Sequence, residues 1–307
     1  GDYRRRGISI RMEKICVHPS GIRCFQALPS GAIVTGCADG SLNLWTRGPH
    51  GVWSNEELKG HSKKITCVQA LGDGRIFTGS EDKTVRIWTQ KETQVWSSVE
   101  LRGHTEAVTC LQVLPNNSLV SGGRDSTIRI WRDLVEGAWE GERCNAPAAV
   151  NCLHCLVDGR IVSGGDDGSL LIWSRDPQGL WGNEELVGNS GAIYSLHVLS
   201  DREMISGGAD EALTMWRRCS EGKWARAYLY GHTRPVGILR PLPDGRIISG
   251  ADDKTVRIWS RSLDGKWSHE VLHDHMSCVW ALQALPDGKL LSVSHNTIRV
   301  WDGEWTS

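Results

Sequence analysis

Seven tryptophans stand at nearly constant intervals along this chain of 307 residues. They are Trp45, Trp88, Trp131, Trp173, Trp216, Trp259 and Trp301, and the successive spacings are 43, 43, 42, 43, 43 and 42 residues. Spacing this regular indicates one supersecondary unit repeated seven times. The chain is long enough for two domains, but a repeat that runs from end to end favours a single one.

The repeated unit is predicted to consist of β-strands. In the copy that ends at Trp259, apolar and polar residues alternate from Thr255 onward, and Asp-Gly and Gly-Ala-Asp-Asp turn signals flank the short β-rich runs. A period of about 43 residues leaves room for four short strands with tight turns. Four-stranded sheets at this period are typical of propeller blades. We therefore expect an all-β, seven-bladed β-propeller of antiparallel blades that forms one domain over residues 1–307.

The N-terminal segment is expected to complete the seventh blade. Only residues 302–307 follow Trp301, too few for a turn and an outer strand, whereas an alternating pattern from Ile8 to Ile15 precedes the first copy. We predict that a strand at about residues 7–16 becomes the fourth strand of blade seven. This pairing would remove an exposed sheet edge.

Charge and hydropathy exclude several classes of function. Lys and Arg number 35 and Asp and Glu 36, a net charge of −1, so no global field attracts nucleic acid or anionic lipid. No run approaches the roughly 18 apolar residues of a membrane span, and residues 1–14 lack the apolar core of a signal peptide. We expect a soluble, cytoplasmic protein that binds neither nucleic acid nor membrane.

The ten cysteines do not indicate a disulfide framework or a metal site. Cys24, Cys67, Cys110 and Cys152 fall on one position of the repeat, and we expect small, buried, reduced side chains there. Cys152 and Cys155 have a metal-like spacing, but residues three apart on a strand point to opposite faces. No metal and no cofactor are expected.

Polar residues recur at fixed distances before the repeated tryptophans. An aspartate lies six positions upstream and a Ser or Thr ten positions upstream in the first six copies, and His18, His61, His104 and His232 lie twenty-seven positions upstream. This pattern resembles the WD40 repeat family over essentially the whole chain. The resemblance implies that His, Ser or Thr, Asp and Trp form a hydrogen-bonded tetrad in blades one, two, three and six.

Three copies depart from the pattern. The fourth and fifth have Asn145-Ala146 and Gly188-Asn189 in place of Gly-His, and the seventh is one residue short, so that His295 or Asn296 stands at the aspartate position. We expect incomplete tetrads there. The same residue types could form a nucleophilic triad, but a catalytic centre is built once. A set that recurs in blade after blade favours buried polar groups that satisfy one another.

A second tryptophan follows the first by eight residues in six copies, at Trp53, Trp96, Trp139, Trp181, Trp224 and Trp267. These residues either cover the outer edges of their blades or form a lateral belt for a partner. The first interpretation is favoured, because an exposed ring of tryptophans would be an apolar liability.

The resemblance also implies a partner-binding face at the turns around a central channel. The matching positions include Arg23, Lys64, Glu81, Arg124, Asp166, Tyr194, Asp252 and Trp280. Arg23, Arg124, Tyr194 and Trp280 stand out, because other copies have small residues there and these types dominate interface hot spots. Arg23 and Trp280 are expected to be neighbours, either as a cation–π pair or as a tryptophan that plugs the channel beside a solvated arginine.

We therefore predict a non-catalytic scaffold that presents a rigid face to a protein or peptide, as a monomer or within a larger complex. Two alternatives stay open. One is the substrate-recognition domain of a ubiquitin ligase or another multidomain regulatory enzyme. The other is a propeller enzyme or glycan binder at the channel mouth, which would need convergent carboxylates, whereas Asp166 and Asp252 lie in copies that are not adjacent.

Overall fold

The computed structural model describes residues 9–11, 19–28, 30–48, 50, 52–91, 95–135, 138–186, 191–273, 275–285, 289–294 and 297–302. These residues form 28 strands in seven four-stranded sheets. Among them no helix is long and apolar enough to cross a membrane. The chain divides into two compact units, residues 18–193 and residues 1–17 with 194–307. We call them the four-blade unit and the three-blade unit and describe each by itself.

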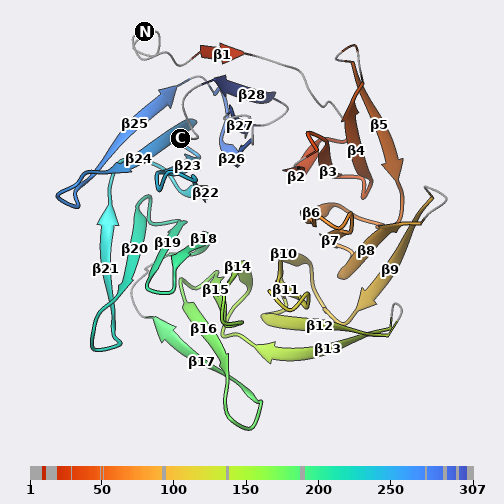
Figure 1. The fold of residues 1–307 in the computed structure, drawn as a ribbon, viewed down its shortest axis with the longest axis horizontal. Coiled ribbons are helices and arrows are strands. Elements are labelled where there is room, and N and C mark those ends of the chain that lie inside the picture. The colour runs from red at the N-terminus through yellow and green to blue at the C-terminus, as the bar shows by residue number, and fades with distance from the viewer. Residues whose placement is uncertain are drawn as a thin grey trace. The chain divides into compact units, whose positions relative to one another are not determined.

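The four-blade unit holds blades one to four, and each blade is an antiparallel sheet of strands that follow one another in the chain (Figure 1). Blade one is β2 (Ile22–Ala27), β3 (Ile33–Cys37), β4 (Leu42–Arg47) and β5 (Trp53–Leu58). Blade two is β6 (Ile65–Ala70), β7 (Ile76–Ser80), β8 (Thr84–Gln90) and β9 (Trp96–Arg102). Blade three is β10 (Val108–Val113), β11 (Leu119–Gly123), β12 (Thr127–Val135) and β13 (Ala138–Asn145). Blade four is β14 (Val150–Cys155), β15 (Ile161–Gly165), β16 (Leu170–Arg175) and β17 (Trp181–Leu186).

The three-blade unit holds blades five to seven. Blade five is β18 (Ile193–Ser200), β19 (Glu203–Gly208), β20 (Leu213–Arg218) and β21 (Trp224–Leu229). Blade six is β22 (Val236–Pro241), β23 (Ile247–Ala251), β24 (Thr255–Arg261) and β25 (Trp267–His273). Blade seven is β26 (Val279–Ala284), β27 (Lys289–Ser294), β28 (Thr297–Asp302) and β1 (Ser9–Arg11).

The N-terminal strand completes blade seven, as the sequence predicts. β1 pairs antiparallel with β28, and Ile10 lies opposite Trp301. The described strand covers three residues, and the rest of the predicted span of 7–16 lies outside the described residues. This pairing gives β28 a neighbour on both sides.

Burial changes from the first strand of a blade to the fourth. In the four-blade unit the first strands β2, β6, β10 and β14 are neighbours, and the fourth strands lie on the outside (Figure 1). β11 is buried at every residue, which explains why its sequence LVSGG is apolar or small throughout. β5 exposes its four central residues, SNEE. The side chains of a blade therefore become more exposed from its inner strands to its outer strand.

The glycines of the second strands make room for the next blade. A Cβ on Gly122 would lie 2.6 Å from Cγ1 of Val150 in blade four and 2.7 Å from the Cys110 sulfur. Burial raises the pKa of the Cys110 thiol well above its usual value. The cysteines of the described residues are free thiols, and Cys24, Cys110 and Cys152 are buried as predicted, whereas Cys67 is half-buried. These sulfurs fill the space between blades.

Candidate functional site

The predicted tetrad is formed in blades two, three and six. In blade two the Trp88 indole N–H donates to Thr78 Oγ1 (2.8 Å), and Thr78 Oγ1 lies 2.8 Å from His61 Nε2. His61 Nδ1 lies 2.8 Å from Asp82 Oδ2. Because a carboxylate only accepts, Nδ1–H donates to Asp82 and Nε2 accepts from the threonine. The chain of hydrogen bonds runs from Trp88 to Asp82 within the blade, so each of these side chains has a structural partner.

Blades three and six repeat this geometry. Ser121 Oγ lies 2.7 Å from His104 Nε2 and accepts from Trp131 (2.9 Å), and the His104 ring reaches Asp125 Oδ2 at 3.0 Å. The corresponding distances in blade six, with Ser249, His232, Trp259 and Asp253, are 2.7, 2.8 and 2.8 Å. In blade one Trp45 donates to Thr35 (2.9 Å), and His18 lies outside the described residues.

The tetrads are held in one charge state. Burial lowers the pKa of His61, and Asp82 offsets this only in part. Burial alone would raise the pKa of Asp82, but the hydrogen bond from Thr84 and the contacts with His61 and the Ser62 N–H outweigh it and hold that pKa at about 2. The histidine is therefore neutral and the aspartate ionised near neutral pH.

The three atypical blades differ in which hydrogen bonds of the tetrad they form. Blades four and five keep the tryptophan–serine bonds, from Trp173 to Ser163 (2.8 Å) and from Trp216 to Ser206 (2.9 Å). The Gly188-Asn189 pair of blade five lies outside the described residues.

In blade seven, His275 Nε2 lies 2.7 Å from Ser292 Oγ, and Nδ1 lies 2.7 Å from Ser294 Oγ. Ser294 thus makes the contact that aspartate makes elsewhere, while His295 and Asn296 lie outside the described residues. Burial and the Arg299 charge lower the pKa of His275 to about 4, and no carboxylate among the described residues offsets them.

A β-bulge lies at the same place in the first strand of six blades. In blade one the register shifts between Ile22 and Cys24, so that Arg23 is the extra residue. The extra residues of the other five are Thr66, Thr109, Asn151, Gly237 and Trp280. A bulge redirects the side chain of its extra residue. Two of the large residues selected from the sequence, Arg23 and Trp280, therefore occupy bulges.

A backbone hydrogen bond joins the turn before the first strand to the turn between the second and third strands. It runs from Glu81 N to Lys64 O (2.9 Å) and from Arg124 N to Ala107 O (2.9 Å), and it recurs at Asp166 and Asp252. We define the turn face of a blade as three residues: the two that this hydrogen bond joins, and the extra residue of the bulge. Seven of the eight site residues predicted from the sequence, all except Tyr194, lie on the turn face of their blade.

The predicted residues of the four-blade unit differ in their partners. Lys64 and Glu81 form an ion pair at 2.6 Å, and Asp166 accepts a hydrogen bond from Asn151 (3.2 Å). Arg23 and Arg124 are exposed and have no ion-pair partner among the described residues. The structure thus brings Lys64 and Glu81 together and leaves two arginines available to a partner.

In the three-blade unit, Tyr194 and Asp252 are exposed and Trp280 is half-buried. Tyr194 exposes 41% of its surface and is one of the few large apolar side chains that do so. The predicted pair of Arg23 and Trp280 would join the two units and stays a prediction.

The second tryptophans bridge neighbouring blades. All six are half-buried, and Trp96, Trp139, Trp181 and Trp267 pack against core clusters. The Trp96 indole donates to Glu56 of the preceding blade (3.3 Å). These contacts favour the interpretation that the rings cover blade edges.

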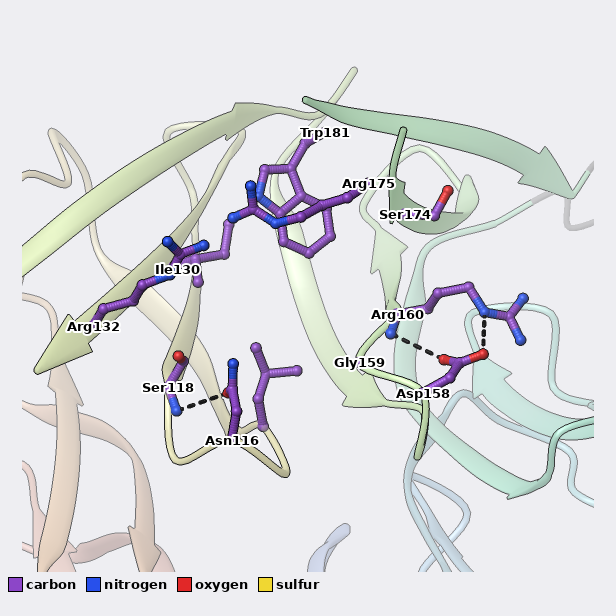
Figure 2. Close-up of a pocket in the computed structure, with 11 residues that line it drawn as sticks. Asn116, Ser118, Ile130, Arg132, Asp158, Gly159, Arg160, Ser174, Arg175 and Trp181 are labelled. Atoms are coloured by element: carbon purple, nitrogen blue, oxygen red, sulfur yellow. Dashed lines mark hydrogen bonds and ion pairs between the residues drawn. The ribbon is translucent and has the colours of Figure 1, made fainter. Parts of the chain in front are cut away.

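A pocket of about 430 Å³ opens between blades three and four, at the opposite end of the first strands from the turn face. The turns at residues 116–118 and 158–160 line one part of it, and Arg132, Arg175 and Trp181 line another (Figure 2). In Figure 2, Arg175 lies over Trp181 and extends toward Arg132. Its guanidinium carbon is 4.6 Å from the ring centroid.

Glu142 of β13 connects the two blades beside this pocket. Its carboxylate accepts from Arg175 Nη2 (2.6 Å) and from the Trp181 indole (3.0 Å), and it pairs with Arg132 Nη2 (2.9 Å). Burial would raise the pKa of Glu142, but the Trp181 and Arg175 hydrogen bonds and both guanidinium charges outweigh it, so the pKa is lowered. Glu142 therefore stays ionised. Within the described residues no group of three or more His, Cys, Asp or Glu could hold a metal ion.

Six segments of the chain match the family model described as "WD domain, G-beta repeat", and together they cover more than half of it. The matched residues are 11–46, 53–89, 96–132, 142–174, 225–260 and 266–302. The chain belongs to the WD40 family. The WD40 matches leave out residues 175–224, where the fifth copy lacks the histidine of the pattern.

Solved WD40 structures share the fold over nearly the whole chain. The RRP9 WD40 repeats match with a TM-score of 0.76 and 20% identity, covering 96% of each chain. The WD40 β-propeller domain of Doa1 matches at 0.77 and 19%, covering 97% of this chain and 99% of the other. U3-55K matches at 0.75 and 20%, covering 96% and 98%. The fold is therefore that of a WD40 β-propeller. A search of curated proteins returned no match.

The pocket between blades three and four was missed by the sequence reasoning. WD40 motifs describe each blade alone, whereas this pocket needs side chains from two blades. The available signal was an arginine directly after Trp131 and another two residues after Trp173, since both positions carry uncharged residues in blade two, Thr89 and Gln90.

Proposed function

We propose that this WD40 domain is a non-catalytic scaffold that binds a protein or peptide through the turn faces of its blades. Arg23, Arg124, Tyr194 and Trp280 would carry the binding, and Lys64, Glu81, Asp166 and Asp252 would surround them. WD40 propellers are generally protein-interaction scaffolds, which supports the proposal at the level of the family. A rigid face requires little reordering on binding, which lowers the entropic cost of association.

The residues at the bulges carry the proposal. Thr66 Oγ1 contacts the carbonyl oxygens of Gly79 (2.9 Å) and of Val108 in the next blade, and Thr109 makes the same two contacts one blade later. The fold therefore has a structural use for a threonine at the bulge. Arg23 and Trp280 cannot make this contact, and they place the residue types that dominate interface hot spots at a redirected position.

The charged pair Lys64–Glu81 should contribute less. Two half-buried side chains near the surface that already neutralise each other gain little from a partner charge, because solvent-accessible ion pairs are worth about 0–1 kcal/mol. Arg23 and Arg124 have no such internal partner among the described residues. They are the better candidates for contact with a carboxylate of a partner.

The test distinguishes partner binding through the turn face from partner binding through the rest of the surface. Arg23→Ala and Trp280→Ala are made singly, and Lys223→Ala serves as control because Lys223 is 84% exposed in the hairpin between β20 and β21. Quantitative pull-downs compare the proteins that each variant captures. We expect either turn-face variant to weaken capture by roughly thirtyfold, about 2 kcal/mol, with melting unchanged.

Full retention by both variants would contradict the proposal. Loss on Trp96→Ala or Trp139→Ala instead, at unchanged melting, would move the interface to the second tryptophans. The ubiquitin-ligase alternative uses the same face and adds one outcome, ubiquitylation of the captured protein. The enzyme and glycan alternative predicts instead that soluble sugars or substrate analogues compete with capture.

A further inference from the structure

The pocket between blades three and four carries an excess of positive charge. Three guanidinium groups, those of Arg132, Arg160 and Arg175, line it. Glu142 pairs with two of them, and Asp158 pairs with Arg160 (2.7 Å). Two carboxylates for three guanidinium groups leave one positive charge uncompensated within this cluster.

The arginines are held in place before any ligand arrives. Arg175 lies over the Trp181 ring at 4.6 Å and donates to the Gly179 carbonyl (2.5 Å). Asp158 Oδ2 fixes Arg160 through its Nε. Arg132 contributes only its Nη2 to Glu142, and its other N–H groups remain for a ligand. A preorganised donor set loses little side-chain entropy on binding.

Exposed apolar residues adjoin two of the lining residues in the sequence. Val157, next to Asp158 in the turn, is 85% exposed, and Leu180, next to Trp181, is 68% exposed. The apolar side chains of Leu114 and Ile130 line the pocket itself. A ligand that matches this surface carries carboxylates with apolar groups beside them, and a bare inorganic anion would leave the apolar part unused. An extended acidic peptide has this combination, because its side chains alternate in direction.

The equivalent positions between blades one and two lack this charge. Thr46 and Gln90 stand where Arg132 and Arg175 stand, while the Asp73–Arg75 turn pair (2.8 Å) and the Trp96–Glu56 bond are kept. The turn pair and the indole bond are thus common to both pairs of blades, and the two additional arginines distinguish the pocket from the same place between blades one and two. This comparison also provides matched controls.

We propose that the pocket between blades three and four binds an extended acidic peptide, whose carboxylates pair with Arg132 and Arg160 and whose apolar side chains contact Trp181. The inference rests on the proposed function as a protein-interaction module. It adds a second docking site, separate from the turn face, and names the chemistry of the segment that occupies it.

A phage-displayed library of random short peptides, selected on the full chain, tests this. We expect the enriched sequences to be acidic, with an apolar residue next to an acid, and their affinity to fall as salt screens the charges. Arg132→Gln should weaken the selected peptides by at least about tenfold. Arg75→Gln, at the turn of blade two, should leave the affinity unchanged.

A second variant blocks the pocket without removing an arginine. Ser174 lines the pocket and is exposed, so Ser174→Trp should abolish peptide binding, whereas Thr46→Trp, at the same strand position in blade one, should not. Neutral or basic selected peptides, or acidic ones that bind Arg132→Gln and Ser174→Trp as well as the wild type, would overturn the inference. Acidic peptides lost only on Arg23→Ala would also overturn it while supporting the turn face. A library that yields no binder contradicts the pocket, and the pull-downs still decide the proposed function.

Discussion

The aspartates of the repeat differ in whether their copy supplies the histidine of the pattern. The Asp253 carboxylate accepts from His232 (2.8 Å), from Thr255 Oγ1 (2.7 Å) and from the Thr233 N–H (3.1 Å). Asp210 stands at the same position of blade five, where the repeat has no Gly-His pair. The two aspartates therefore offer a comparison within one chain.

We expect Asp253→Ala to lower the free energy of unfolding by about 1–3 kcal/mol, because buried donors lose their acceptor, and by more than Asp210→Ala does. Urea denaturation of both variants measures this. Equal losses would mean that the histidine adds nothing to the network of blade six.

The titration of His275 in blade seven makes the stability of the folded protein depend on pH over a limited range. The folded-state pKa of His275 is about 4, below its ordinary value of about 6.5. Between these values the unfolded chain binds a proton at this side chain and the folded chain does not, so stability falls as pH drops from 6.5 toward 4. Below about 4 both states are protonated and the effect stops growing.

We expect His275 to account for roughly 3 kcal/mol of this loss, measured as the free energy of unfolding at a series of pH values. His275→Asn should reduce the slope below pH 6.5, to which His61 with its lowered pKa also contributes, and leave the lower window, in which Asp82 with its pKa of about 2 titrates, unchanged. A variant with the slope of the wild type would show that His275 is not the group that titrates.

The sequence predicted the residues whose role repeats and missed those whose role does not. His61, His104 and His232 were found because the same offsets recur, and their bonds are confirmed. Ser294 was missed, because the deletion of one residue in blade seven moves the aspartate position and only the fold shows which side chain reaches His275. The Lys64–Glu81 pair was missed as a pair, since the two residues meet only when the two turns of a blade are joined.

Among elements, the second strand of each blade shows how tightly neighbouring blades pack. A Cβ on Gly122 of β11 would come within 2.6 Å of Val150 and 2.7 Å of Cys110, and both belong to buried first strands. Gly72 of blade two, by contrast, has no atom within 4 Å of such a Cβ.

We expect Gly122→Ala to destabilise the protein by about 1–3 kcal/mol through overpacking, and Gly72→Ala to have little effect. Thermal and urea unfolding of the two variants decide this. A Gly122→Ala protein as stable as Gly72→Ala would mean that blades three and four move apart at little cost.

The strands themselves were predictable and the bulges were not. Alternation in segments such as β24, with the period of about 43 residues, gives strand type and number. The bulge at Arg23 follows from the register between β2 and β3, and a sequence does not show a register shift of one residue. The pocket depends on β12 and β17 belonging to adjacent blades, so Arg132 lies 49 residues before Trp181 in the sequence.

On the scale of the whole molecule, the chain begins in the sheet in which it ends. β1 contributes three residue pairs to β28, from Ser9 with Asp302 to Arg11 with Val300. Without β1, β28 would become the edge of the blade seven sheet, with unpaired N–H and C=O groups that can pair with another chain. The outer strands of the other blades precede the next blade in the chain, so only blade seven depends on a segment from the opposite terminus.

Deletion of residues 1–15 should therefore lower the melting temperature, broaden the transition and promote aggregation. The control is deletion of residues 1–7, which keeps β1 and should behave as the full chain. Light scattering after gel filtration and thermal unfolding compare the two truncated proteins at equal concentration. A peptide of residues 7–16 added to the longer deletion should restore part of the lost stability, because it can pair with β28 as an added strand. If both truncated proteins elute as monomers and melt together, β28 is stable as an edge and the pairing with β1 contributes little to the fold.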